Sequence, residues 1–271
     1  MPELPEVEVI KNMIKPYLEK KIISYAIVRN KKLKYLIPRN IVNIHNQKIL
    51  NIKRRGRYII IILLYNSIII HLGMTGNLFI IEKDMLSYGK HDHIDLIMDN
   101  NIILRYTDSR KFGFWLWETK NYKDNIFLKK LGPEPLKNEF NSKYLYKFTK
   151  KKNIPIKILL MDNCIVTGIG NIYASESLFL SKILPTRISK TLNFKEINIL
   201  VKNIKYILNK SIKYGGSSIK DYRQPNRKIG NFHKLLFVYG KQNKLCKICC
   251  TKIIKIKQRN RSTFFCSKCQ I

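Results

Sequence analysis

YIIIILLYNSIIIH, residues 58–71, is the stretch that sets the fold class of this 271-residue chain. Two runs of β-branched and aliphatic residues flank the polar pair Asn66-Ser67, and this pattern predicts two strands joined by a hairpin turn. Both runs need cover from water, which a sandwich or a barrel of strands provides. The stretch therefore predicts a mostly antiparallel β domain.

Runs of the same kind continue on both sides of this hairpin. Together they predict strands at residues 22–28, 58–64, 68–71, 93–98, 102–106 and 112–117. Ahead of them, Pro5 stands where the first turn of a helix tolerates proline. Apolar residues then recur at helical spacing, namely Val9, Ile10, Met13, Ile14 and Tyr17. A short amphipathic helix therefore opens the predicted domain.

The segment LGPEPL, residues 131–136, marks a change from strands to helices, because two prolines and a glycine interrupt regular structure there. Helical patterns follow at residues 154–161, 172–181 and 194–214. The last has an apolar face of Ile197, Leu200, Val201, Ile204 and Leu208. Residues 215–234 are polar, basic and without a period, which predicts a mobile loop. We therefore expect an α+β protein with a β domain at 1–130, a helical domain at 131–235 and a cysteine-bearing hairpin at 236–271.

The charge balance predicts a polyanionic partner. The chain has 52 Lys and Arg against 18 Asp and Glu, a net charge of +34, which is more than solubility requires. An AT-rich genome, which favours Lys, explains part of the excess, and the rest favours phosphate binding that weakens with salt. The longest apolar run, 58–65, is too short for a membrane helix. The start MPELPEVEVI is unlike a secretory signal, so we expect a cytoplasmic protein.

Four of the six cysteines form two close pairs. Cys246 and Cys249 are followed, after sixteen residues, by Cys266 and Cys269. Each pair can offer two thiolates to tetrahedral zinc, and the length between the pairs fits a β-hairpin. Two disulfides or four free thiols are the alternatives, but in a reducing compartment the spacing favours one structural zinc ion. Residues 241–271 hold nine Lys or Arg and no acid, which suggests that this hairpin lies on a phosphate backbone.

Two glycines precede a predicted helix in the middle of the chain. Gly168 and Gly170 stand just before Asn171, where the helical pattern begins. Free backbone N–H groups at a helix N-terminus bind anions, and glycine allows a phosphate to approach them closely. Such glycines also simply end one helix and start the next, so the residues alone leave both readings open.

The N-terminus offers a nucleophile. Removal of Met1 would expose Pro2 as a secondary amine, with the carboxylates Glu3 and Glu6 beside it. An α-amine is partly unprotonated at neutral pH and can attack a carbonyl-level carbon, which makes a Schiff base possible. The alternative is that the two acids only cap the first helix and interact with its dipole.

Seven motifs, in order along essentially the whole chain, resemble those of formamidopyrimidine-DNA glycosylase. They are MPELPEVE at 1–8, HLGMTG at 71–76, KHDHIDL at 90–96, RYTDSRKFG at 105–113, LGPEP at 131–135, GIGNIYASE at 168–176 and the cysteine pairs. The resemblance implies an N-terminal catalytic β-sandwich, a helix-two-turns-helix DNA-binding domain and a zinc-finger hairpin. It also implies that the partner is damaged double-stranded DNA.

The resemblance further implies a glycosylase and abasic-site lyase of base excision repair, acting on 8-oxoguanine and formamidopyrimidines. Pro2 would be the nucleophile that attacks C1′ of the damaged nucleotide and forms an iminium link to the sugar. Glu3 would be the acid/base partner, and Glu6 would support the site. Strand cleavage by β,δ-elimination follows, and Arg261 resembles the residue assigned to δ-elimination.

Several further residues match DNA-contacting positions of the family. Met74, Arg110 and Phe112 resemble the residues that fill the space left by a flipped nucleotide, with Arg110 facing the orphaned cytosine. Core packing is the alternative for Met74 and Phe112, although both stand in turn-like contexts. The other positions that resemble DNA contacts are His91, Lys151 or Lys152, Asn171 and Arg261.

One residue departs from the family pattern. The family motif RRxKY has a lysine where this chain has Arg57, in the stretch RRGRY at residues 54–58. The family assigns that position to lesion recognition and β-elimination, so Arg57 is a candidate catalytic residue. Arginine keeps the charge, but it is a poor proton donor or acceptor. We therefore expect the glycosylase activity to survive better than the lyase activity.

Two alternative functions remain open at this point. A glycosylase of the endonuclease VIII type would use the same terminal proline on oxidised pyrimidines, but the set of Met74, Arg110 and Phe112 favours the purine enzyme. A non-catalytic zinc-ribbon protein that binds nucleic acid would also be strongly basic, but it leaves Pro2 and its two carboxylates unexplained. We expect a monomer, because no part of the sequence indicates oligomerisation.

Overall fold

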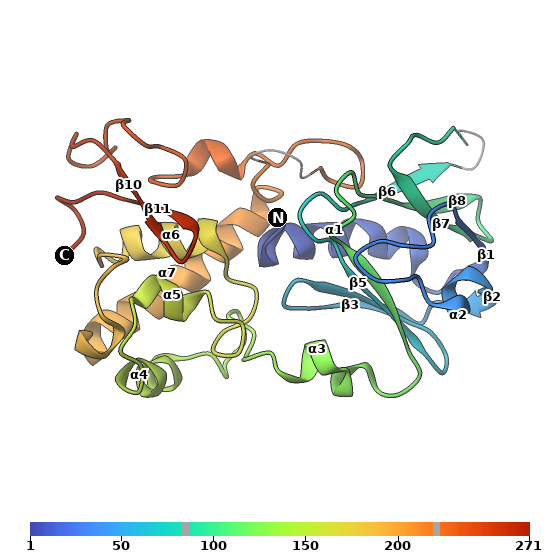
Figure 1. The fold of residues 1–271 in the computed structure, drawn as a ribbon, viewed down its shortest axis with the longest axis horizontal. Coiled ribbons are helices and arrows are strands. Elements are labelled where there is room, and N and C mark those ends of the chain that lie inside the picture. The colour runs from blue at the N-terminus through green and yellow to red at the C-terminus, as the bar shows by residue number, and fades with distance from the viewer. Residues whose placement is uncertain (83–86, 219–222) are drawn as a thin grey trace. The chain divides into compact units, whose positions relative to one another are not determined.

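The computed structural model describes residues 1–82, 87–218 and 223–271. Their contacts divide the chain into two compact units (Figure 1). The first unit joins Met1–Lys129 to Tyr214–His233, and the second joins Lys130–Lys213 to Lys234–Ile271. In the described part of the chain, no helix is both long enough and apolar enough to cross a membrane.

Helix α1 (Leu4–Leu18) opens the first unit, with Pro5 in its first turn as the sequence predicts. The backbone N–H of Glu3 donates a hydrogen bond of 2.9 Å to Glu6 Oε2, so the carboxylate satisfies a donor at the helix start. One face of the helix is fully buried, through Val7, Ile10, Ile14 and Leu18. Tyr17, from the predicted apolar stripe, is instead 48% exposed near the end of the helix.

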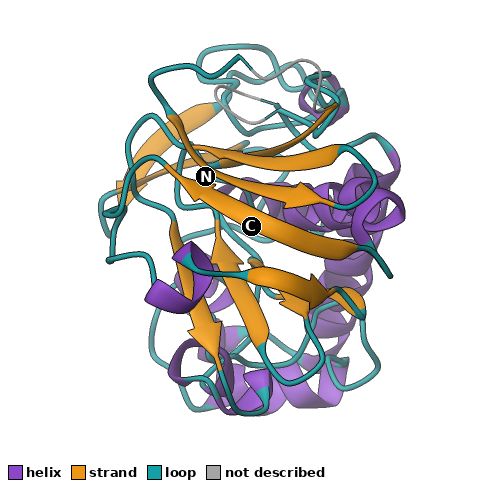
Figure 2. Cartoon of the chain, turned by 90° about the vertical axis from the view of Figure 1, so that its right-hand side faces the viewer, coloured by secondary structure: helices purple, strands orange, loops and turns teal. Residues whose placement is uncertain are grey.

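Two antiparallel sheets make up most of the first unit (Figures 1 and 2). One sheet has the strand order β2-β1-β7-β8-β6 and the other has the order β3-β4-β5-β9. Their strands are β1 (Ile22–Val28), β2 (His45–Lys48), β3 (Asn51–Arg55), β4 (Tyr58–Ile62), β5 (Ser67–His71), β6 (Asn77–Glu82), β7 (Asp92–Met98), β8 (Ile102–Thr107) and β9 (Phe114–Glu118). Short helices α2 (Arg39–Val42) and α3 (Ile126–Lys129) flank them.

The hairpin of β4 and β5 confirms the prediction drawn from residues 58–71. The two strands pair in antiparallel register from Tyr58↔His71 to Ile62↔Ser67. The turn spans residues 63–66 and is closed by a bond of 2.9 Å from Leu63 N to Asn66 O. Ser67 therefore belongs to the second strand rather than to the turn.

The sheets share one apolar core. Side chains from both sheets and from α1 meet in it, including Ile61, Ile70 and Trp115 of one sheet and Leu96 and Leu104 of the other. Ile60 and Ile69, on the opposite face of the hairpin, are fully buried as well. Because both faces of β4 and β5 are covered, their sequence is continuously apolar rather than alternating.

All six strands expected from the sequence are present, and the structure adds β2, β3 and β6. The first two were missed because their sequences, HNQK and NIKRR, are polar. Strand β3 nevertheless pairs with β4 along its whole length, from Asn51↔Ile62 to Arg55↔Tyr58. Tertiary pairing outweighs local β propensity there.

The second unit is helical apart from one hairpin. It contains α4 (Ser142–Lys150), α5 (Ile156–Leu160), α6 (Asn171–Leu180), α7 (Phe194–Lys213), β10 (Ile254–Gln258) and β11 (Arg261–Phe265). Helix α6 contacts α5, α7 and β11, and residues 172–179 of it are buried. The predicted apolar face of α7 is buried as expected. A short 3₁₀ helix spans Ser189–Thr191. Two others lie at Tyr122–Asp124 in the first unit and at Phe232–Leu235, where the chain passes from the first unit to the second.

Residues 214–233 return to the first unit after α7. Ser217 N donates a hydrogen bond of 2.8 Å to Glu6 Oε1, and Ile80 N donates one of 3.3 Å to Pro225 O. A side chain at Gly230 would meet two backbone oxygens at 2.4 Å, so only glycine fits this return. The mobility predicted for 215–234 stays a prediction, and residues 219–222 lie outside the described part.

Candidate active site and nucleic-acid interface

The N-terminal turn brings the predicted nucleophile and its two carboxylates together. Pro2 is buried, and Glu3 and Glu6 are 4% and 1% exposed. One oxygen of Glu6 accepts from Glu3 N at 2.9 Å, and the other accepts from Ser217 N at 2.8 Å. The Glu6 carboxylate therefore ties the start of the chain to a segment 211 residues later. This arrangement fixes the backbone from which Pro2 projects.

Arg57 lies beside this turn. It is 9% exposed, and its Nη1 is 3.8 Å from Met1 Sδ. Strand β3 ends at Arg55 and β4 begins at Tyr58, so Gly56 and Arg57 form a two-residue hairpin loop. Gly56 has φ 56°, a value that glycine adopts at little cost at the first position of such a loop. The loop therefore holds a guanidinium next to the chain's first residue.

His71 is a neutral neighbour of this cation. Burial, together with the charges of Arg57 and Lys34, lowers the pKa of His71 from 6.5 to about 4. Its Nδ1 faces the backbone N–H of Gly73 at 3.1 Å, so this nitrogen accepts and carries no proton. The ring stacks on Phe114, with centroids 5.0 Å apart. These contacts hold an uncharged imidazole in place near neutral pH.

The predicted void-filling residues are exposed on loops of the first unit. Met74 is 40% exposed and Phe112 is 47% exposed, which excludes core packing as their role. The guanidinium carbon of Arg110 lies 4.6 Å from the centre of the Phe112 ring. His91 is also exposed, directly before β7. All four side chains are therefore available to a ligand.

A second group of predicted DNA contacts lies in the other unit. Lys151 and Lys152 are exposed at the end of α4, Asn171 begins α6, and Arg261 is exposed at the start of β11. Asn171 Nδ2 donates a hydrogen bond of 2.8 Å to Ser262 O. The start of α6 is thus joined to β11, the strand of the cysteine hairpin that carries Arg261.

Lys157 bonds both the start of α6 and strand β11, although no sequence pattern pointed to it. Its side chain is 1% exposed, and Nζ donates to Asn171 Oδ1 at 2.5 Å, Thr263 Oγ1 at 2.7 Å and Ser262 O at 3.1 Å. A buried ammonium needs such partners. The available signal was a single lysine inside the apolar run IPIKILL of residues 154–160.

Glu176 is a second buried charge that sequence patterns missed. It accepts hydrogen bonds of 2.8 to 2.9 Å from the backbone N–H groups of Phe237, Val238 and Tyr239. Burial raises the pKa of this carboxyl, while the three N–H groups oppose the rise. Helix α6 is thereby fixed to the segment that leads into the cysteine hairpin.

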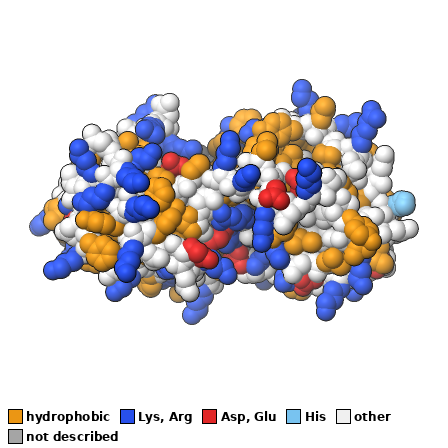
Figure 3. Space-filling model, turned by 90° about the horizontal axis from the view of Figure 1, so that it is seen from below, with side chains coloured by type: hydrophobic (Ala, Val, Ile, Leu, Met, Phe, Trp, Pro, Cys, Tyr) orange, Lys and Arg blue, Asp and Glu red, His pale blue; other side chains and the backbone are white. Residues whose placement is uncertain are grey.

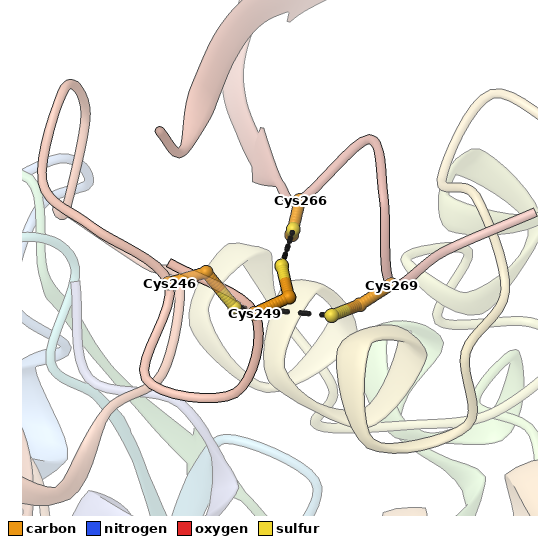
Figure 4. Close-up of side chains that lie close together, drawn as sticks. All are labelled: Cys246, Cys249, Cys266 and Cys269. Atoms are coloured by element: carbon orange, nitrogen blue, oxygen red, sulfur yellow. Dashed lines mark hydrogen bonds between the residues drawn. The ribbon is translucent and has the colours of Figure 1, made fainter. Parts of the chain in front are cut away.

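The four paired cysteines converge on one point, as the spacing predicts (Figure 4). Their sulfur atoms all lie within 4.8 Å of one another. Cys249 and Cys266 are 3.4 Å apart, and Cys246 and Cys269 are 3.9 Å apart, measured between Sγ atoms. Strands β10 and β11 form the hairpin between the two pairs. Four thiolates at this spacing are a donor set that suits a tetrahedral metal ion.

Basic side chains spread over the face shown in Figure 3 and are interleaved with hydrophobic ones, and acidic side chains are fewer. This excess of basic side chains agrees with the net charge of +34. Such a surface attracts the phosphates of a nucleic acid over a wide area and releases their counterions on binding.

Comparisons with known proteins show which family the chain resembles over its length. Residues 1–115 match the formamidopyrimidine-DNA glycosylase N-terminal domain, and residues 131–223 match the H2TH domain of the same enzyme. A formamidopyrimidine-DNA glycosylase of Proteus mirabilis is 47% identical over 270 residues, which is 100% of this chain and 98% of that protein.

Solved structures are similar over the same length. A Lactococcus lactis enzyme mutant in complex with DNA containing Fapy-dG has a TM-score of 0.92 and 34% identity, over 99% of each chain. A MutM protein in complex with DNA containing carbocyclic 8-oxo-G has a TM-score of 0.90 and 33% identity, also over 99% of each chain. The chain therefore belongs to the formamidopyrimidine-DNA glycosylase family.

Proposed function

We propose that this chain is a glycosylase and abasic-site lyase that removes oxidised purines from duplex DNA in base excision repair. The observation that carries the proposal is the N-terminal turn. Its buried Glu3 and Glu6 follow Pro2 closely in the chain, and Glu6 is held on both carboxylate oxygens. Full-length similarity to enzymes of this name, and to structures holding Fapy-dG or 8-oxo-G DNA, supports it.

The chemistry that we propose begins after Met1 is removed. The lone pair of the Pro2 nitrogen attacks C1′ of the damaged nucleotide, the bond from C1′ to the base breaks, and the base leaves with the electron pair and a proton. Glu3 transfers protons in this step. The Pro2 nitrogen then loses its own proton, the bond from C1′ to O4′ breaks and O4′ is protonated, which leaves an iminium between Pro2 and the opened sugar. This iminium acidifies the C2′ protons, so loss of one of them breaks the C3′–O bond and expels the 3′ phosphate. A second elimination, to which we assign Arg261, releases the 5′ phosphate.

The DNA contacts follow from the need to reach a base that is stacked in a duplex. The nucleotide is flipped out at the cost of its stacking and pairing. We propose that Met74 and Phe112 fill the space left behind, because both are exposed apolar side chains, and that Arg110 satisfies the edge of the orphaned cytosine. The proposed phosphate contacts are His91, Lys151, Lys152, Asn171 and Arg261.

A panel of duplexes tests the substrate class. We expect the chain to excise 8-oxoguanine opposite cytosine and formamidopyrimidine at least about tenfold faster than an oxidised pyrimidine in the same sequence, because Arg110 suits an orphaned cytosine. Single-turnover excision rates measure this. Faster release of the oxidised pyrimidine would identify an endonuclease VIII type of activity, and binding without release of any base would identify a non-catalytic protein.

We propose that the four-cysteine cluster holds one structural zinc ion. All four ligand positions are filled by protein sulfur, so no position is left open for a substrate. By coordinating Cys246, Cys249, Cys266 and Cys269, the ion would hold the hairpin that presents Arg261 rigid. The cellular location and the domain bounds are separate proposals. Because the proposed substrate is chromosomal DNA in bacteria, we propose a cytoplasmic location. The division of the chain at residues 130 and 235 stays a prediction.

Cys249→Ser and Cys250→Ser form a matched pair that tests this zinc site. Cys249 belongs to the cluster, whereas the adjacent Cys250 is exposed and outside it. We expect Cys250→Ser to keep one zinc per chain, and Cys249→Ser to lose it together with a few kcal/mol of stability, since metal binding is coupled to folding. Metal analysis and thermal unfolding measure both. Equal zinc content in the two variants would contradict the assignment.

A further inference from the structure

Asp108 is a fully buried acid at the end of β8. Its carboxylate accepts four hydrogen bonds. Oδ1 accepts from Thr75 Oγ1 at 2.5 Å and from Arg110 N at 3.3 Å, and Oδ2 accepts from Gly113 N at 2.8 Å and Tyr106 Oη at 3.0 Å. One carboxylate therefore ties down the middle and the end of the loop at residues 108–113.

The backbone of Asp108 reaches a second segment. Its N–H donates a hydrogen bond of 3.0 Å to His91 O, and its carbonyl oxygen lies 2.8 Å from Nε2 of the buried His93. The residue that fixes the loop at 108–113 is thus also bonded on both sides of the start of β7. The exposed His91 side chain projects from this junction.

Thr75 connects a third segment to the same carboxylate. Its hydroxyl donates to Asp108 and accepts from Arg110 N at 3.1 Å. Thr75 itself is 7% exposed, next to the exposed Met74. The turn also packs closely on the loop, because a side chain at Gly73, which has φ 62°, would lie 2.4 Å from Gly113 N.

The hydrogen bonds of Asp108 explain how the loops that carry these exposed side chains keep a fixed conformation. Met74, Arg110 and Phe112 lie on loops and have little burial of their own to hold them. A buried carboxylate, by contrast, costs much free energy unless its hydrogen bonds are made, and bonds to an ionised acceptor are strong. Burial raises the pKa of Tyr106, and the Asp108 charge raises it further, so its phenol remains a donor.

We propose that Asp108, through Thr75, is the positioning residue for opposite-base recognition. It holds the segments that carry Met74, His91 and Arg110 in one arrangement, so that the Arg110 guanidinium meets the edge of the base opposite the lesion. This inference rests on the proposed function, because it assigns a role within that reaction. Asp108 touches no reacting atom in this role.

A role in stability alone is the competing explanation, and one ratio separates the two. Loss of folded protein lowers excision of 8-oxoguanine opposite cytosine and opposite adenine by the same factor. Displacement of Arg110 lowers excision opposite cytosine selectively, because the guanidinium is matched to the cytosine edge. The ratio of the two single-turnover rates therefore reports positioning and is insensitive to the amount of active enzyme.

Thr75→Val and Thr75→Ser are the variants that carry the test. Valine has the shape of threonine but lacks the hydroxyl that bridges Asp108 and Arg110 N, so only the longer direct bond of 3.3 Å between them is left. Serine retains the hydroxyl. We expect Thr75→Val to lower the cytosine-to-adenine ratio about tenfold, the loss that corresponds to one hydrogen bond to a charged group. Thr75→Ser should stay within about twofold of the wild-type ratio.

Ser211→Ala is the matched control, because it removes a buried hydroxyl bond of 2.6 Å to Tyr173 in the other unit. It should lower the melting temperature and leave the ratio unchanged. An unchanged ratio in Thr75→Val, or an equal loss in Ser211→Ala, would overturn the inference while leaving the wild-type activity and the proposed function intact. A wild-type chain that excises 8-oxoguanine opposite neither base would contradict the proposed function itself.

Discussion

Pro2→Gly should lower the yield of the borohydride-trapped adduct on a duplex carrying 8-oxoguanine opposite cytosine by at least about a hundredfold. Borohydride reduces an iminium to a stable amine, so the trapped species reports the covalent link directly. Proline forms a permanently charged iminium and its ring fixes φ, whereas glycine gives a mobile primary amine whose imine needs a proton. The bonds among Glu3, Glu6 and Ser217 use no atom of the Pro2 ring, so the turn should persist in the variant.

Pro5→Gly is the control for this change, since Pro5 lies close to Pro2, in the first turn of α1, but offers no amine. It should trap within a few-fold of wild type, because a first-turn proline contributes to the helix and not to the reaction. An inserted residue that prevents removal of Met1 turns the Pro2 nitrogen into an amide, and this form should bind DNA but not trap. Adduct formation by that blocked chain would place the nucleophile elsewhere.

Arg57→Lys should raise the rate of cleavage at a preformed abasic site by on the order of a hundredfold, the usual contribution of one general acid or base. Arginine keeps its proton at any pH a protein experiences, whereas a lysine that is largely out of water gives its proton up more easily. The side chain is 9% exposed and its Nη1 is 3.8 Å from the first residue, so lysine at this position would reach the same region.

Arg55→Lys provides the matched comparison, because residue 55 stands at the other end of the same two-residue loop. It should leave abasic-site cleavage within about twofold of wild type, since it adds no proton donor or acceptor beside the nucleophile. Release of 8-oxoguanine should change less than strand cleavage in Arg57→Lys. The expectation fails if the wild-type chain cleaves the abasic site as fast as Arg57→Lys does.

Apolar patterns in the sequence were sufficient for most of the fold. The hairpin at 58–71, the six predicted strands and the apolar face of α7 all follow from side chains that must leave water. Strand β3 was missed because its charges suggest a surface. In the structure, Arg54 of β3 bonds Glu8 of α1 at 2.6 Å. Burial alone would raise the pKa of Glu8, but Lys11 and Arg54 lower it, and this pairing depends on a contact 46 residues away.

In the candidate site as well, local sequence patterns predicted some residues, whereas residues that depend on distant partners were missed. The cysteine cluster was predictable because metal-ligand spacing is local and leaves few alternatives. The roles of Lys157, Glu176 and Asp108 were not, because each depends on partners that only the fold brings near. Lys157, for example, bonds Thr263 at a separation of 106 residues. Buried charges of this kind are invisible to periodicity, since a single charged residue in an apolar run has no pattern of its own.

The return of residues 214–233 to the first unit has a consequence for biosynthesis. The ribosome adds roughly 5–20 residues per second and makes the N-terminus first, yet Glu6 obtains its bond from Ser217 only when residue 217 has emerged. Pro2 is therefore synthesised at the start, whereas the bond that holds the neighbouring Glu6 forms only late in synthesis. A nascent or prematurely terminated chain that ends within α7 would contain Pro2 but would lack the hydrogen bond from Ser217 to Glu6. Under the proposed function, strand cleavage would then begin only after synthesis of the chain has passed residue 217.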